Sequence, residues 1–348
     1  MKTLAAVLVE LGEPLQLHEL EIPALQYGQV LVRILCSGIC GSQLAEIAGV
    51  KGPDAYLPHL LGHEACAEVL EVGTGVKRVK AGQRVVLHWR KAAGLEGPPA
   101  SYHCEKLGKV NSGCVTTFSE YSVVSENRLT PISSQVAPRV AALMGCAVTT
   151  GAGVINRDAN VQLGESLLIF GAGGVGLSVL QAGRLAGALP ITVVDRFRNR
   201  LDLAESLGAD RVIDSSAESD IEELLRSQGG YDVIVEGTGH VPFIEMAYRL
   251  SSAQGRTVLV GVPRAGEKAE IFTLPLHFGK VLRGSHGGDS QPDKDIPRYL
   301  KLYEAGRLDL QSLVTATYPF AEINQALDDM RSGAVAGRVV LDMGCSPQ

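Results

Sequence analysis

Hydrophobic and polar positions follow two different patterns along the chain. Up to about residue 147, short apolar runs are separated by turns that contain Gly and Pro, which is typical of irregular, strand-rich structure. Beyond that point, nearly continuous apolar runs are spaced by helical segments, which predicts parallel strands connected by helices. We expect strands at residues 30–35, 67–72, 84–87, 167–170, 191–194, 211–213, 233–235, 257–260 and 281–285.

These patterns predict an α/β fold made of two kinds of domain. The second part is expected to form a doubly wound parallel sheet of the Rossmann type with helices on both faces, and the first part a small, partly barrel-like β domain. The tail adds a final strand at residues 338–341. We place the domains at residues 1–147, 148–286 and 287–348, with the last segment returning to the first domain. The helices that we expect lie at residues 198–207, 217–227, 293–305 and 321–331.

The composition of the 348 residues limits the kinds of protein that the chain can be. A hydrophobic content of 45% and a charged content of 20% are those of a globular protein. A net charge of −6 without a basic run argues against nucleic acid binding. The longest apolar stretch, residues 167–180, is interrupted by glycines and does not predict a membrane span. Seven unevenly spaced cysteines do not resemble a secreted disulfide framework, so we expect the reducing cytoplasm.

A glycine-rich turn, Gly-Ala-Gly-Gly-Val-Gly, follows the strand at 167–170 and opens a helix. Glycines there permit a tight turn, approach of the backbone to a pyrophosphate, and close packing of helix on strand, and the helix N-terminus attracts phosphate. Asp195 ends the next strand, where an acidic residue binds the adenosine ribose, so we expect NAD in preference to NADP. A turn that binds no ligand is the alternative. The expected cofactor-binding residues of the turn are Gly171, Gly173, Gly174, Val175 and Gly176.

Three residues from separate segments are candidates for a metal site. Cys40 lies in Gly-Ile-Cys-Gly-Ser, His63 in Gly-His-Glu and Cys146 in Gly-Cys-Ala. Two thiolates and one imidazole would leave a tetrahedral zinc one open position for water or substrate. Taken singly, each residue has an ordinary alternative, a small buried cysteine or a hydrogen-bonded histidine, and their spacing alone does not select them.

Several motifs in order make the chain similar to the zinc-dependent alcohol dehydrogenases of the medium-chain dehydrogenase/reductase superfamily. The resemblance extends over essentially all 348 residues. It implies that the strand-rich domain is a GroES-like catalytic domain. It also implies that Cys40, His63 and Cys146 bind one catalytic zinc, which is the ligand set known from alcohol dehydrogenase. The motifs lie at residues 38–42, 62–64, 145–146, 171–176, 260–263 and 337–338.

The same resemblance implies roles for further residues. Ser42 would hydrogen-bond the substrate oxygen and pass its proton outward, and Glu64 would lie behind the metal. Trp89 and Phe118 would line the substrate pocket, with plain core packing as the alternative. The residues expected near the cofactor are Val260, Val262 and Ser285 at the nicotinamide and Arg338 at the pyrophosphate.

Two departures from the family pattern affect these expectations. Many relatives carry four closely spaced cysteines that hold a structural zinc, whereas residues 88–117 contain only Cys104 and Cys114, so we expect one zinc per chain and no structural zinc. Relatives often carry Asp after the relay hydroxyl and a His at the end of the relay, where this chain has Gln43 and no such His. The proton path beyond Ser42 is therefore open, and other candidates for it are His59, His88 and His286.

Together these features predict a reversible, NAD-dependent oxidoreductase that converts an alcohol, polyol or sugar alcohol into an aldehyde or ketone. A zinc-free NADPH-dependent enone or quinone reductase on the same scaffold is the first alternative. A non-enzymatic dinucleotide-binding protein that kept the fold is the second. The expected partner is a small-molecule alcohol or carbonyl substrate, and the resemblance implies a homodimer or homotetramer.

Overall fold

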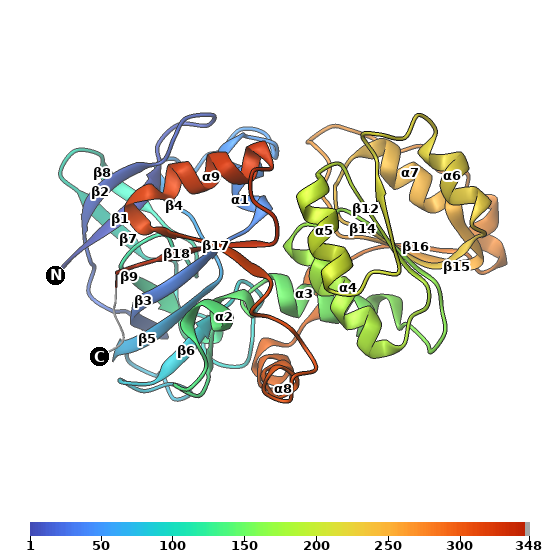
Figure 1. Ribbon diagram of the computed structural model, residues 1–348. Coiled ribbons are helices and arrows are strands. Elements are labelled where there is room, and N and C mark those ends of the chain that lie inside the picture. The colour runs from blue at the N-terminus through green and yellow to red at the C-terminus, as the bar shows by residue number, and fades with distance from the viewer. Residues whose placement is uncertain (345–348) are drawn as a thin grey trace.

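The computed structural model describes residues 1–344, and Cys345, which the sequence suggests is an ordinary cysteine, lies outside them. Figure 1 shows two parts. One is strand-rich and combines the N-terminal half with the C-terminal tail, and in the other, helices cover a central sheet. The short helix α3 (Ala147–Gly153) lies between the two parts. Within the described residues, no helix is both long and apolar enough to span a membrane.

A closed barrel forms one side of the strand-rich part. Its strands are β1 (Lys2–Leu8), β2 (Gln16–Glu21), β7 (Ser101–Cys104), β8 (Gly108–Asn111) and β4 (His59–Leu60), in that order. The β7–β8 hairpin comes from the stretch in which many relatives carry the cysteine lobe, and here it pairs with β2 and β4. Alternate side chains of these strands, among them Leu20, Tyr102 and Val110, form one buried cluster.

A seven-stranded sheet completes the strand-rich part. β18 pairs antiparallel with β3 and parallel with β17 of the same tail, so the tail lies in a sheet whose remaining strands come from the N-terminal half. The domain boundaries at residues 147 and 286 stay a prediction. The strands of this sheet are β10 (Leu129–Pro131), β6 (Arg84–Leu87), β5 (Ala65–Val72), β3 (Gln29–Ile39), β18 (Arg338–Asp342) and β17 (Val314–Pro319), with β9 (Tyr121–Ser125) paired to β3.

The other part is a six-stranded sheet whose neighbouring strands all run parallel. Its order is β13 (Arg211–Asp214), β12 (Ile191–Asp195), β11 (Leu167–Phe170), β14 (Tyr231–Glu236), β15 (Ser251–Leu259) and β16 (Val281–Gly284). This is the Rossmann order 3-2-1-4-5-6, and the order reverses between β11 and β14, where such sheets bind nucleotides. The helices on its faces are α4 (Gly174–Ala186), α5 (Arg198–Ser206), α6 (Ile221–Ser227) and α7 (Val241–Leu250).

The two parts share one hydrophobic cluster. Cys66 and Val86 of the strand-rich sheet belong to the same buried cluster as Ile169 of the Rossmann sheet. Gly151 in α3 lets α4 approach closely, because an added Cβ would lie 2.5 Å from Cβ of Ser178. The remaining helices are α1 (Gly41–Ile47), α2 (Pro138–Leu143), α8 (Pro292–Glu304) and α9 (Ile323–Ser332).

The structure confirms the predicted fold class and moves only the ends of several elements. The predicted helix at 217–227 begins at Ile221, because the Asp220 side chain accepts a hydrogen bond from the Glu223 backbone N–H and caps the first turn. β15 begins earlier than predicted, at Ser251. Each nearly continuous apolar run of the second half became a strand, since such runs suit a sheet that is covered on both faces.

Candidate metal centre and nucleotide crevice

The structure brings the three candidate metal ligands together. Cys40 directly precedes α1, His63 lies between β4 and β5, and Cys146 directly precedes α3. One donor atom from each lies within 4.8 Å of the others, and the two Sγ atoms are 4.0 Å apart. Zn–S bonds of about 2.3 Å in tetrahedral geometry separate two sulfurs by about 3.8 Å. The spacing of the two thiols therefore suits a zinc ion.

One ring nitrogen of His63 is available to bind a metal. Its Nδ1 lies 2.5 Å from Nε2 of Gln43. Its Nε2 is buried and has no hydrogen-bond partner among residues 1–344. A buried nitrogen without a partner is costly, and bound zinc would remove that cost. The donor set and this unpartnered nitrogen together fit the metal that the family resemblance implies.

The two thiols influence each other strongly. The pKa of Cys40 lies well below its ordinary value, first because Cys146 donates a hydrogen bond to it, and then because of His63 and the positive charge of Arg338. The pKa of Cys146 is raised by its bond to Cys40 and by burial, against which hydrogen bonds from Trp89 and Thr150 act. The contact between the two sulfurs therefore lowers the pKa of Cys40 and raises that of Cys146.

A buried ion pair lies next to this centre. The Arg338 guanidinium donates to a carboxylate oxygen of Glu64, and the two side chains are 3% and 0% exposed. Gly38 leaves room for Glu64, since an added Cβ would lie 2.9 Å from its carboxyl carbon. The stem of Arg338 crosses the nucleotide turn, because a Cβ on Gly174 would lie 2.1 Å from its Cδ. Arg338 thus contacts both Glu64, the neighbour of His63, and Gly174 of the turn, and its approach to a pyrophosphate stays a prediction.

The other predicted catalytic and pocket residues differ in how close the structure places them to the proposed ligands. The Ser42 Oγ is buried and without a hydrogen-bond partner in the described part of the chain. Trp89 approaches Cys146 closely enough to hydrogen-bond its sulfur, whereas Phe118 is fully buried and packs on Gly62, directly before His63. Their roles toward a substrate stay predictions.

The glycine turn has the geometry that close helix–strand packing requires. Gly171 has a φ of +95°, and an added Cβ on Gly176 would lie 1.8 Å from the Gly171 carbonyl oxygen. Gly173 has open space where a side chain would be, with no atom of the described residues within 4 Å of an added Cβ. The backbone conformation therefore requires glycine at position 171, and close packing requires it at position 176. Gly173 leaves the approach to the turn open.

The Asp195 side chain, at the end of the neighbouring strand β12, hydrogen-bonds the turn. One carboxylate oxygen accepts from the Ala172 N–H at 2.7 Å and the other from the Phe197 N–H at 3.0 Å. Arg200 lies 3.9 Å from this carboxylate and, like Arg196, stacks on the Phe197 ring. The acidic residue is thus held at the end of β12 beside the turn, and its contact with a ribose stays a prediction.

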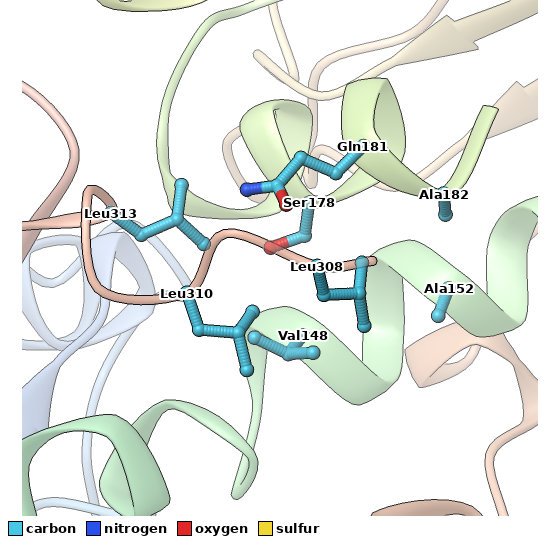
Figure 2. A pocket seen from close by; sticks show the side chains of 8 residues that line it. All are labelled: Val148, Ala152, Ser178, Gln181, Ala182, Leu308, Leu310 and Leu313. Atoms are coloured by element: carbon cyan, nitrogen blue, oxygen red, sulfur yellow. The ribbon is translucent and has the colours of Figure 1, made fainter. Parts of the chain in front are cut away.

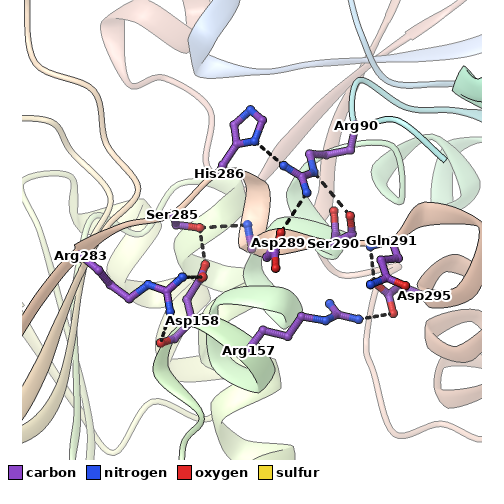
Figure 3. A network of polar contacts seen from close by, with 11 residues as sticks. Arg90, Arg157, Asp158, Arg283, Ser285, His286, Asp289, Ser290, Gln291 and Asp295 are labelled. Carbon is purple, nitrogen blue, oxygen red and sulfur yellow. Dashed lines mark hydrogen bonds and ion pairs between the residues drawn. The ribbon is translucent and has the colours of Figure 1, made fainter. Parts of the chain in front are cut away.

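The three residues expected near the nicotinamide differ in their surroundings. Val260 is half-buried against the shared core, whereas Val262 is 71% exposed. The Ser285 hydroxyl donates to Asp158 at 2.6 Å and accepts from the Gly288 N–H (Figure 3). The Ser285 side chain is therefore already engaged, and any contact that it makes with a nicotinamide stays a prediction.

Sequence reasoning missed a polar network at the junction of the two parts (Figure 3). Arg90 follows β6 and donates to His286 and, at 3.1 Å, to Asp289, both of which follow β16. The His286 ring also packs edge-on against Trp89 at 5.0 Å. The family position of Trp89 and the relay candidate His286 pointed to this region, but the network itself was missed because no local pattern pairs residues so distant in sequence.

The other two relay candidates have ordinary structural roles. His59 bonds Asp54 and the Leu60 carbonyl. His88 is fully buried between the Arg90 carbonyl and the Thr130 hydroxyl, and burial lowers its pKa to about 4. Both imidazoles are therefore committed to protein partners.

A small apolar cavity lies apart from the metal centre (Figure 2). It is lined by α3, α4 and the segment 308–313, with Leu308 and Leu310 facing Val148. Its volume of about 10 Å³ is at the lower limit for one water molecule. Gln181 closes one side through two hydrogen bonds to the backbone of Asp309. This cavity is a packing defect and no ligand site.

Comparison with known proteins agrees with the site. Residues 26–134 match the family model for the alcohol dehydrogenase GroES-like domain, and residues 174–305 match that for zinc-binding dehydrogenases. An S-(hydroxymethyl)glutathione dehydrogenase of Synechocystis is 31% identical, over 96% of this chain and 98% of that protein. The chain belongs to the zinc-dependent alcohol dehydrogenase family.

Solved structures of the family have the same architecture over the whole chain. An alcohol dehydrogenase zinc-binding domain protein from Burkholderia ambifaria superposes with a TM-score of 0.89 at 30% identity, over 98% of this chain and 99% of that one. Benzyl alcohol dehydrogenase from Acinetobacter calcoaceticus has a TM-score of 0.88 at 28% identity, over 99% and 100% of the chains. The chain is therefore an oxidoreductase of the zinc alcohol dehydrogenase type, as the sequence predicts.

Proposed function

We propose that this member of the zinc-dependent alcohol dehydrogenase family uses one zinc per chain and NAD to interconvert an alcohol and an aldehyde or ketone. The observation that carries the proposal is the buried, unpartnered Nε2 of His63 beside the Cys40 and Cys146 thiols. Within residues 88–117, Cys104 is buried in the barrel cluster and Cys114 lies near the Gly97 carbonyl. This supports a single zinc.

Each protein group has a distinct task in the proposed reaction. Zinc on Cys40, His63 and Cys146 would supply Lewis acidity that lowers the pKa of an alcohol hydroxyl. Ser42 would accept the hydroxyl proton and pass its own hydroxyl proton outward to water, and its buried Oγ is free of partners among the described residues. Glu64 would hold Arg338 in place beside Cys40 and Gly174.

The crevice of the Rossmann sheet would bind the nicotinamide cofactor, which supplies the redox chemistry. The open face of Gly173 supports close approach of a pyrophosphate to the turn. The Asp195 carboxylate would accept hydrogen bonds from the ribose hydroxyls and repel a 2′-phosphate. In an Asp195→Ser variant, the negative charge that repels a 2′-phosphate is gone, and the positive charges of Arg196 and Arg200 remain. We expect the ratio of kcat/KM for NAD to that for NADP to fall at least about ten-fold.

The named relatives guide the choice of substrate. They act on S-(hydroxymethyl)glutathione and benzyl alcohol according to their names, so primary alcohols head the panel that we propose, followed by secondary alcohols, polyols and sugar alcohols. A zinc-free NADPH-dependent enone or quinone reductase, or a dinucleotide-binding protein without activity, remains the alternative.

The decisive experiment measures zinc content and NAD reduction on the same purified sample. We expect about one zinc per chain and turnover of at least one alcohol. Cys40→Ala should lose zinc and turnover together, whereas Cys114→Ala, a cysteine outside the ligand set, should keep both. Full turnover by metal-free protein would refute the zinc mechanism. Reduction of enones with NADPH alone would favour the reductase.

We also propose a homo-oligomer, dimer or tetramer, in the cytoplasm. Thiolate ligands favour a reducing compartment. The edge strand β16 and the segment before it expose apolar side chains, of which Phe272 and Phe278 are 70% exposed or more. An apolar patch at a free sheet edge is typical of an interface. Light scattering should find more than one chain per particle, and Phe272→Asp should lower that number.

A further inference from the structure

Gln43 holds an unusual position between two of the proposed zinc ligands. It is the third residue of α1 and is 1% exposed. Its Oε1 accepts the Cys40 backbone N–H at 2.9 Å, and its Nε2 lies 2.5 Å from Nδ1 of His63. A backbone N–H can only donate, so the amide atom that faces Cys40 must be the oxygen. The NH2 group of Gln43 therefore faces His63.

This orientation determines where the His63 ring carries its proton. An amide NH2 can only donate, so Nδ1 of His63 must accept. A neutral imidazole then carries its proton on Nε2, the buried nitrogen that lacks a partner within residues 1–344. A histidine that binds zinc through Nε2 needs the opposite arrangement, with a lone pair on Nε2 and an N–H on Nδ1 that donates to a neighbouring acceptor.

We propose that Gln43 is a positioning residue whose amide reorients when zinc binds, so that zinc affinity is coupled to the first turn of α1. This inference rests on the proposed function of the zinc site. With zinc on Nε2 of His63, the Gln43 oxygen turns to accept the Nδ1–H. The Cys40 N–H then loses its acceptor, because one amide oxygen cannot reach both donors from the side where its NH2 now lies.

The cost of this exchange falls on zinc binding. A partly buried N–H without an acceptor destabilises the zinc-bound form. A carboxylate of the same length has two acceptor oxygens, so it serves both donors at once. Gln43→Glu should therefore bind zinc about 10-fold to 100-fold more tightly than the natural chain, which is the range by which partners of metal ligands change affinity. The same helix also carries Ser42, so the exchange occurs beside the proposed proton acceptor.

The first test measures zinc affinity of the full chain by competition with a chromophoric chelator. Gln43→Glu should bind about 10-fold to 100-fold more tightly. Glu46→Gln makes the reverse exchange of amide and carboxylate three residues further along α1. Glu46 is half-buried and hydrogen-bonds none of the three proposed ligands within residues 1–344, so this variant should change affinity by less than about two-fold. Equal affinities of the natural chain and Gln43→Glu would overturn the inference. An equally large effect of Glu46→Gln would show that charge alone is responsible and would also overturn it.

The second test follows the Cys40 N–H directly in the natural chain. Ile39–Cys40 is the only Ile–Cys pair in the sequence, so labelling with ¹³C-carbonyl Ile and ¹⁵N-Cys gives one assigned amide signal. Zinc should accelerate hydrogen exchange of this amide in the natural chain and leave it protected in Gln43→Glu. Unchanged protection in the natural chain would overturn the inference while zinc binding still supports the proposed function. Absence of any zinc binding would overturn both.

Discussion

The buried Glu64–Arg338 pair joins two segments that lie far apart in the sequence, and its contribution to the stability of the folded chain can be measured. Arg338→Met keeps much of the apolar stem that packs on Gly174 but removes the guanidinium. Glu64, 0% exposed, then loses its ionic partner. Breaking a buried pair in this way costs about 3–5 kcal/mol, a large share of the roughly 5–15 kcal/mol by which proteins are stable.

An exposed pair provides the matched control. The side chains of Lys2 and Glu19 are 57% and 62% exposed, and solvent screens such surface pairs. Lys2→Met should therefore leave the urea midpoint of unfolding close to that of the natural chain. The double variant Glu64→Gln, Arg338→Met removes both charges of the pair and should recover at least about half of the loss caused by Arg338→Met.

Urea denaturation followed by tryptophan fluorescence measures these differences. Trp89 is the single tryptophan of the chain, and it follows β6 beside Cys146, so its emission reports on the part that contains the pair. The reasoning is refuted if Arg338→Met loses no more stability than Lys2→Met. It is also refuted if the double variant loses the sum of the two single losses, because the side chains would then act independently.

Two further predictions concern the turn and a buried imidazole. Gly176→Ala should cost more than about 2 kcal/mol in chemical denaturation, because its methyl group would lie 1.8 Å from a carbonyl oxygen. Gly173→Ala should cost under about 1 kcal/mol but weaken NAD binding in calorimetry; similar stability losses for both would contradict this. Burial lowers the pKa of His88 to about 4 in the folded chain, against about 6.5 when unfolded. The unfolded chain therefore binds more protons, and about 3 kcal/mol of stability should be lost as pH falls from 6.5 to 4. His88→Gln should remove this part of the pH dependence, and an unchanged profile of unfolding free energy against pH would show that His88 is not its source.

The sequence by itself determined the positions of the strands and the nature of the nucleotide turn. The runs at 167–170 and 191–194 coincide with β11 and β12 to within one residue. Asp195 lies at the end of its strand as expected and bonds the turn through the Ala172 N–H. These features were predictable because apolar periodicity and glycine turns are local properties of a few neighbouring residues.

The metal ligands were only partly predictable. Cys40, His63 and Cys146 stand in different loops, and their spacing did not select them from the other cysteines and histidines. Resemblance to a known family did, and the structure then placed their donor atoms within 4.8 Å of one another. The hydrogen bonds of Gln43 had no signal in the sequence beyond the departure from the family pattern.

Only the tertiary structure decided which distant segments meet. β18 pairs with β3, and this pairing brings Arg338 from the end of the chain to Glu64 and to Gly174 of the nucleotide turn. In the same way, Arg90 meets His286 and Asp289 across the junction of the two parts. Residues at such separations leave no common periodicity, because strand pairing and packing of whole elements, and not local preference, determine their contact.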